Sequence, residues 1–202
     1  KTYRNIGDIA LISSLIFNND FSLLNQKIKE LEKDNNSKEI TISKSREKDI
    51  PKDLLFSITS HLKQLNISTS NLSKKKYIFD ESIDNLLLNE KDLVDKIFLD
   101  LQSHLILCEK NSGIWSVEYL NEIVFGQKKP YDLKTLKEGV PIMCTKNNNE
   151  LGLSNGDIGV LIGLKNKRKY LFRKFNDNNE EIVALIDPSN LENVVPAIAI
   201  TI

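Results

Sequence analysis

The sequence predicts an α/β fold that carries a small antiparallel β-barrel. The first observation is an apolar run, HLILC at 104–108, followed by a short Gly-containing turn and a helical pattern at 117–125. Strand, tight turn and helix make half of a βαβ unit, and such a run is typical of a strand covered on both faces. The second observation is that short apolar runs alternate with Asn- and Gly-containing turns beyond 138. Strands at this spacing predict a small barrel, which we place at 138–192.

The composition is that of an ordinary globular protein, with 40% hydrophobic residues, 28% charged residues and no net charge. Any surface for nucleic acid therefore has to be a local patch of cations. No apolar run approaches the ~18 residues of a membrane span and no signal peptide is visible, so we expect a soluble cytoplasmic protein. Cys108 and Cys144 lie in apolar runs without zinc-type spacing, and we expect buried free thiols.

The N-terminal half of the chain predicts helices. Apolar residues recur at helical spacing over 7–17, 22–33, 50–62 and 80–100. The polar stretch NISTSNLSKKK at 66–76 is interpreted as a linker between the last two of these helices.

The common chemical motifs are absent from the sequence. There is no GxxxxGK[ST] loop to cradle a triphosphate, so we expect no ATP hydrolysis by this chain alone and no bound cofactor. There is no metal-ligand spacing either, and we expect no metal. His61 and His104 are isolated in the sequence, and we interpret both as structural or solvent-facing.

The most informative stretch is VPIMCTKNNNELGLSNGDIGVLIG at 140–163. It resembles the RecD family of superfamily 1 DNA helicases, the alpha subunit of exodeoxyribonuclease V. In that family a strand and a polar loop lead to Asn-Gly-Asp, a hydrophobic residue and Gly. The matching residues here are Ile142, Met143, Asn147, Leu151, Gly152, Asn155, Gly156, Asp157, Ile158 and Gly159.

Three further stretches match the same family in the right order. Thr2-Tyr3-Arg4 followed by GDIALISSLI resembles helicase motif IV and its helix. LILCEKNSGIWSVEYLNEIV at 105–124 resembles a strand, Gly turn and helix of the second RecA-like domain. AIAITI at 197–202 resembles the strand that leads into motif V. Because this strand stops just before that motif, we expect the chain to be a piece of a longer protein. Residues 20–100 match weakly.

The resemblance implies that residues 1–137, with 193–202 as a returning strand, form part of a RecA-like helicase domain. Residues 138–192 would be an inserted Src-homology-3-like barrel. It also implies ATP-dependent 5′–3′ translocation on single-stranded DNA in a RecBCD-type exonuclease, with ATP and Mg as cofactors of the full-length protein. RecB- and RecC-like subunits would be its partners. Two alternatives stay open: a non-catalytic DNA- or protein-binding module built on the barrel, and a purely structural domain.

Arg4 is the candidate catalytic and ATP-contacting residue. It matches the motif IV arginine, which in such motors reaches the γ-phosphate across the cleft between domains. A guanidinium in a dry cleft stabilises the charge that develops on the transferred phosphoryl oxygens. The alternative is an ordinary surface arginine.

Four polar residues are candidates for contact with DNA. Lys110 and Ser112 lie in the Gly turn, and Asn147 and Asn155 lie in the loop of the matched stretch. The Asn-Gly-Asp turn also has a purely structural interpretation, since such residues tolerate positive backbone dihedrals.

A cluster of cations, here called the basic hairpin, is a candidate for phosphate contact. A solvated hairpin without such a role is an equal alternative. Tyr170 and Phe172 alternate within it and are expected in the barrel core rather than as platforms for bases. The cations of the basic hairpin are Lys165, Lys167, Arg168, Lys169, Arg173 and Lys174.

Overall fold

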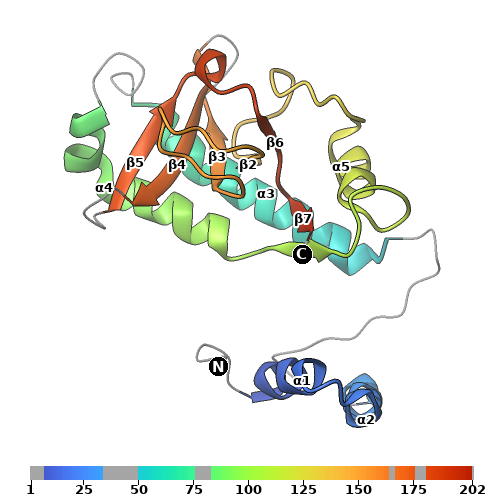
Figure 1. Cartoon of the computed structure of the whole chain (residues 1–202). Helices are drawn as coiled ribbons and strands as arrows, with labels where there is room; N and C mark the ends of the chain where they lie inside the picture. Colours follow the sequence, from blue (N-terminus) through green and yellow to red (C-terminus); the bar gives the residue numbers. More distant parts are fainter. Residues whose placement is uncertain (1–6, 34–49, 76–82, 164–166, 176–180, 202) are drawn as a thin grey trace. The chain divides into compact units, whose positions relative to one another are not determined.

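The computed structural model describes residues 7–33, 50–75, 83–163, 167–175 and 181–201 (Figure 1). The chain divides into two compact units, Lys1–Pro51 and Lys52–Ile202. No helix in the described parts is long and apolar enough to cross a membrane.

The first unit is a pair of helices, α1 (Gly7–Phe17) and α2 (Phe21–Lys33). Asp20 begins the second helix, because its Oδ1 accepts a hydrogen bond from the Leu23 backbone N–H at 3.2 Å. Lys27 and Asp8 form an ion pair of 2.8 Å between the two helices. Apolar side chains remain exposed on more than one side of α1: Ile9, Leu11, Ile16 and Phe17.

The second unit is built on a five-stranded antiparallel sheet with the order β5-β4-β3-β2-β6. Its strands are β2 (Pro141–Cys144), β3 (Ile158–Ile162), β4 (Lys169–Phe175), β5 (Glu181–Ile186) and β6 (Val194–Pro196). A short 3₁₀ helix, η3 (Pro188–Asn190), precedes β6.

Two long helices, α3 (Lys52–Ser73) and α4 (Ile83–Gln102), pack against each other and against one face of this sheet (Figure 1). Alternate strand residues face the helices, as the two-residue period of a strand requires. The core of this layer holds Leu65, Leu72, Val94, Ile97, Phe98 and Leu101 from the helices, and Val160, Ile162, Leu171 and Val183 from the strands.

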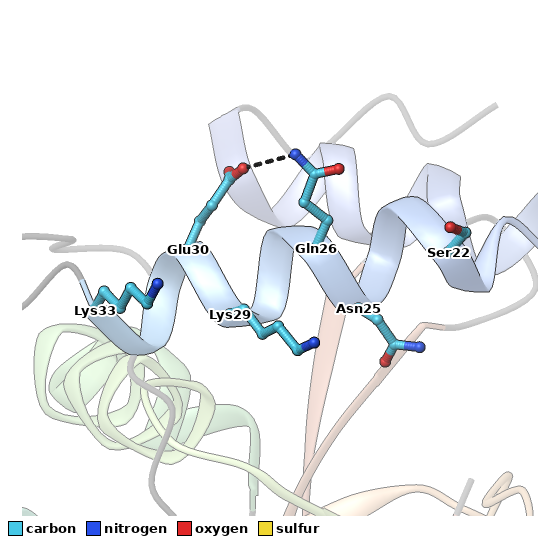
Figure 2. Close-up of a pocket in the computed structure, with 6 residues that line it drawn as sticks. All are labelled: Ser22, Asn25, Gln26, Lys29, Glu30 and Lys33. Atoms are coloured by element: carbon cyan, nitrogen blue, oxygen red, sulfur yellow. Dashed lines mark hydrogen bonds between the residues drawn. The ribbon is translucent and has the colours of Figure 1, made fainter.

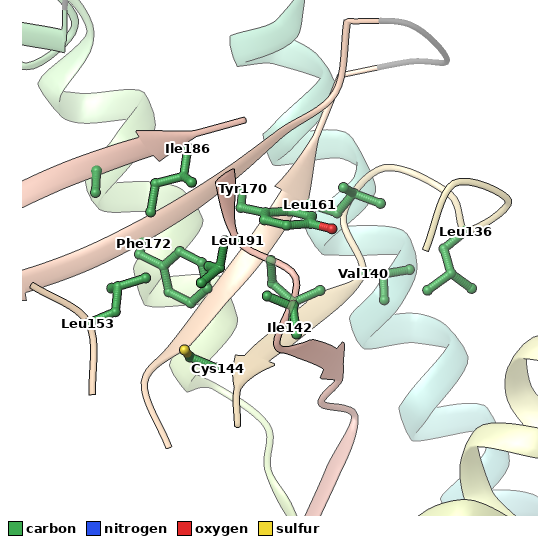
Figure 3. Packing of buried hydrophobic residues seen from close by; sticks show 12 residues of the cluster. Leu136, Val140, Ile142, Cys144, Leu153, Leu161, Tyr170, Phe172, Ile186 and Leu191 are labelled. Carbon is green, nitrogen blue, oxygen red and sulfur yellow. The ribbon is translucent and has the colours of Figure 1, made fainter. Parts of the chain in front are cut away.

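The opposite face of the sheet has a core of its own (Figure 3). Leu161 lies between Val160 and Ile162 in β3 and points into this second cluster. Tyr170 and Phe172 are buried there, as predicted. Cys144 is part of the cluster, and both cysteines are buried free thiols, which confirms that prediction.

A parallel pair of strands forms a separate small sheet. β1 (Ile106–Cys108) pairs with β7 (Ala199–Thr201), so the end of the described chain returns to the strand before the Gly turn. α5 (Val117–Phe125) follows that turn, and Ser116 caps it by accepting a hydrogen bond from Tyr119 N–H at 3.1 Å.

Two sequence-based expectations about local structure are wrong. The run 104–108 is not covered on both faces, because Leu105 is 50% exposed and Leu107 is 56% exposed. The stretch 66–76 is not a linker, since α3 continues to Ser73. The Thr69 hydroxyl donates a hydrogen bond to the backbone oxygen of Leu65 at 2.8 Å, so this polar side chain has a partner inside the helix.

Hydrogen bonds of Glu138 join the segment before β2 to α3. The Glu138 carboxylate is 4% exposed and accepts hydrogen bonds from Ser70 Oγ (3.0 Å), Ser73 Oγ and Gly163 N–H (2.9 Å). The Asn66 amide donates to Glu138 O at 2.8 Å. Gly139 follows with φ of +86°, and a Cβ there would lie 2.5 Å from the Asn66 backbone nitrogen.

We predict that Gly139→Ala destabilises the chain far more than Gly113→Ala. Both glycines have positive φ, but a Cβ at Gly113 meets no atom within 4 Å, whereas one at Gly139 meets the α3 backbone. The clash adds about 1–3 kcal/mol to the backbone strain that both variants share. Urea unfolding of the two variants measures the difference, and equal losses would contradict the close approach to α3.

Candidate functional site

Arg4, the candidate catalytic residue, lies outside the described residues. Its role in contacting ATP therefore stays a prediction. Lys165 of the basic hairpin also lies outside them.

The matched loop between β2 and β3 is closed by its own polar residues. Asn147 Oδ1 accepts a hydrogen bond from Asn155 N–H at 2.7 Å, which joins the two sides of the loop. Asp157 Oδ2 accepts from Ser154 N–H at 2.8 Å, and Gly156 N–H donates to a main-chain oxygen of β2 at 2.8 Å. The residues of the motif thus hold one another in place. Contact of Asn147 or Asn155 with DNA stays a prediction, but the Asn147 oxygen already has an internal partner.

The turn after β1 presents Lys110 and Ser112 to solvent at the carboxyl end of a parallel strand. The turn is held by its backbone, since Lys110 O accepts from Val117 N–H at 3.2 Å and Gly113 O accepts from Ser116 Oγ at 2.7 Å. Ligands of open α/β sheets bind at this end of the strands. Contact of these two side chains with DNA stays a prediction.

Two of the cations in the first half of the basic hairpin bind to other residues of the chain. Lys169 Nζ pairs with Asp187 at 2.7 Å. Arg168 Nη1 donates to Leu133 O at 2.7 Å, and its Nε is buried with no hydrogen-bond partner among the described residues. Lys167 is exposed and makes no ion pair within the described parts of the chain.

The second half of the basic hairpin joins β4 to the helical layer. Arg173 forms ion pairs with Asp95 of α4 and Glu181 of β5, and its guanidinium carbon lies 4.4 Å from the centre of the Phe98 ring. Lys174 donates to Leu151 O. Lys169 and Arg173 are thus paired with carboxylates, and Arg168 and Lys174 donate to backbone carbonyls, which favours the structural interpretation of these four cations.

A histidine pair missed by the sequence interpretation lies between α3 and the end of α4. The His61 and His104 rings stack with centroids 5.0 Å apart and planes at 27°. Ser57 Oγ lies 2.9 Å from His104 Nε2. Burial lowers the pKa of both rings. The charge of His104 lowers the pKa of His61 further, and Asp100 opposes this. Their partnership could be found only by knowing how the two helices pack.

The polar face of α2 is a second place where polar side chains gather (Figure 2). Gln26 Nε2 donates to Glu30 Oε1 at 3.2 Å. The face carries both signs of charge and its described residues come from one helix, so it resembles a solvated surface. No group of three or more His, Cys, Asp or Glu within the described residues could hold a metal ion.

We predict that Asn147→Ala destabilises the chain by about 0.5–1.5 kcal/mol, the ordinary value of one hydrogen bond. Its carboxamide oxygen is the acceptor for Asn155 N–H. Asn149→Ala is the matched control, because Asn149 is exposed and uses only its backbone oxygen in the same loop. Thermal unfolding of both variants tests this, and equal melting temperatures would argue against the internal role.

We predict that His61→Gln reduces the loss of stability on acidification. The folded pKa of His61 is lowered from 6.5, so the unfolded chain takes up a proton first as the pH falls. The stability that neutral His61 contributes is present above pH 6.5 and is lost as the pH falls through the lowered pKa. Unfolding at about pH 7.5 and about pH 5.5 measures this, since carboxylates titrate mostly below that window. The same slope in variant and wild-type chains would contradict the prediction.

Comparisons with known proteins place this geometry in context. No protein-family model matches the chain. The "RecBCD enzyme subunit RecD" of Buchnera aphidicola subsp. Schizaphis graminum (strain Sg) is 30% identical over 103 residues, which cover 46% of this chain and 17% of that protein. The crystal structure of Pif1 helicase from Bacteroides in complex with ADP-AlF3 and ssDNA overlaps 80% of this chain and 42% of its own, with 14% identity. Its TM-score of 0.28 carries no argument about the fold. The chain is thus distantly similar to RecD, over a short part of that protein's length.

Proposed function

We propose that this chain is part of the motor of a RecD-type, ATP-dependent 5′–3′ DNA helicase. The similarity to RecD, 30% identity over 103 residues, is the observation that carries the proposal. Because the match covers 17% of that protein, the activity, substrate and partners of the whole protein all belong to the proposal. By the same reasoning, the longer protein acts on single-stranded DNA with RecB- and RecC-like subunits in double-strand break repair and recombination.

The strand arrangement supports the corresponding domain assignment. In the proposal, 138–192 form a Src-homology-3-like barrel, and the antiparallel meander β2 to β5 agrees with it. Strand β6 lies in the range 193–202 but pairs with β2 of this sheet. Residues 1–137 and 193–202 would belong to a RecA-like domain, and the parallel pair β1–β7 beside α5 agrees with that. Helices α3 and α4 fall in the range 1–137, but they share a hydrophobic core with the sheet of the range 138–192.

Exposed apolar side chains in both units agree with a partial RecA-like domain. A helix that is apolar on all sides is normally buried, yet α1 exposes Ile9, Leu11 and Ile16. Leu107 of strand β1 and Leu105, which directly precedes that strand, are exposed as well. Parallel sheets are normally covered on both faces, so these are the surfaces that further elements of a longer protein would cover.

The sequence holds no phosphate loop, and we assign no step of hydrolysis to the described residues. ATP and Mg²⁺ would be held elsewhere in the longer protein, and Arg4 is the one residue that we propose to face the γ-phosphate. The alternative of a non-catalytic binding module gains little from the basic hairpin, because Arg168, Lys169 and Arg173 have internal partners.

We predict that Arg4→Ala in the longer protein lowers ATP turnover by about a thousandfold while nucleotide binding is kept, as for other arginines that stabilise a transferred phosphoryl group. Lys1→Ala is a control for loss of a nearby cation. ATPase assays with single-stranded DNA, together with nucleotide binding, measure both. Unchanged turnover would remove Arg4 from the mechanism, and DNA-stimulated turnover by residues 1–202 alone would contradict the proposal that the chain lacks the nucleotide site.

A further inference from the structure

A groove of about 590 Å³ lies between α3, the end of α5 and the segment that leads into β2. Buried and half-buried apolar side chains line it, and two exposed lysines are among its lining residues. The residues that define this groove, here called the α3–α5 groove, are Leu62, Lys63, Val124, Phe125, Leu136 and Lys137.

Hydrogen bonds within the protein hold the end of α5 and the loop that follows it, which form one wall of the α3–α5 groove. Gly126 ends α5 in the left-handed conformation, and its N–H donates to Glu122 O at 2.8 Å. Gln127 then holds the following loop, because its Oε1 accepts from Asp132 N–H at 2.9 Å and its Nε2 donates to Thr135 Oγ1 at 2.7 Å. The groove is therefore preorganised, which lowers the free-energy cost of binding.

The charge of the α3–α5 groove is positive. Lys63 and Lys137 are exposed, and neither makes an ion pair within the described parts of the chain. Glu138 is the acidic residue of the lining, but its carboxylate is turned toward Ser70 and Gly163 and is buried. A ligand in the groove thus meets mainly apolar side chains and two ammonium groups, together with the polar side chains of Thr59, Asn66, Gln127 and Thr135.

Two exposed apolar side chains lie on the same side of α3 as the groove residues Thr59 and Lys63. Phe56 is 73% exposed and lies three residues before Thr59, and Ile67 is 48% exposed and lies four residues after Lys63. Residues three and four apart share one side of a helix, so Phe56, Thr59, Lys63 and Ile67 follow one another over about 16 Å, or three turns. The two apolar side chains add surface that a partner protein would cover.

We propose that the α3–α5 groove binds an acidic amphipathic helix of a partner protein. Such a helix would place apolar residues at spacings of three and four in the groove and carboxylates beside Lys63 and Lys137. The apolar lining and the small number of cations favour a peptide over a nucleic acid, which requires many phosphate contacts. This inference does not depend on the helicase assignment.

The probe is a synthetic amphipathic helix of roughly 14 residues, about four turns, with leucines on one face and glutamates beside them. Residues 1–202 are titrated with it while backbone amide NMR signals are followed. The same peptide with lysines in place of glutamates, and a single-stranded thymidine oligonucleotide, are the comparison ligands. We expect the acidic peptide to bind most tightly and to shift the amides of Leu62, Lys63, Val124 and Phe125.

The double variant Lys63→Glu/Lys137→Glu should weaken binding of the acidic peptide by about tenfold, since two attractions between exposed charges become repulsions. Lys74→Glu/Lys146→Glu changes two exposed lysines outside the groove and should leave the affinity unchanged. Val124→Ser should also weaken the peptide. Equal affinity for the acidic and basic peptides, no binding, shifts outside the groove, or tighter oligonucleotide binding that depends on Lys63 and Lys137 would each overturn the proposal.

Discussion

The carboxylate of Glu138 lies between α3 and the end of β3, where two serine hydroxyls and a backbone N–H donate to it. A buried carboxylate is costly unless donors satisfy it, so this group favours the one arrangement in which helix and strand are both in place. Its neighbour Gly139 lets the backbone approach α3 to a distance that a side chain would prevent. This contact joins α3 to the segment that enters β2, and that segment is also one wall of the α3–α5 groove.

The parts of the fold that depend on neighbouring residues could be predicted from the sequence. β3, β4 and β5 follow from apolar runs separated by Asn and Gly turns, and α5 follows from its pattern after Ser116. The full length of α3 could not be predicted, because its polar second half is stabilised from a distance. Ser68 donates to Asp100, 32 residues away, and Ser70 donates to Glu138, 68 residues away.

The same distinction applies to the candidate site. The stretch that resembles RecD indicated Asn147 and Asn155 as candidates, and these two residues form a hydrogen bond with each other across one loop. The pairing of Arg173 with Asp95, which are 78 residues apart, has no local signal in the sequence, so charge alone overstated the cations available to DNA. His61 and His104 meet only because α3 packs on α4. Arg4 rests on sequence similarity alone.

Native-state hydrogen exchange tests most directly whether the Glu138 link makes α3 and the sheet one cooperative unit. We expect amides of α3 near Leu65 and Leu72 to open with the same free energy as those of β3 near Val160 and Ile162. In Glu138→Ala, the buried donors of Ser70 and Gly163 lose their acceptor, and the opening free energy of α3 should fall by about 1–3 kcal/mol. Exchange of α3 that is much faster than that of β3 in the wild-type chain, or that is unchanged in the variant, would contradict it.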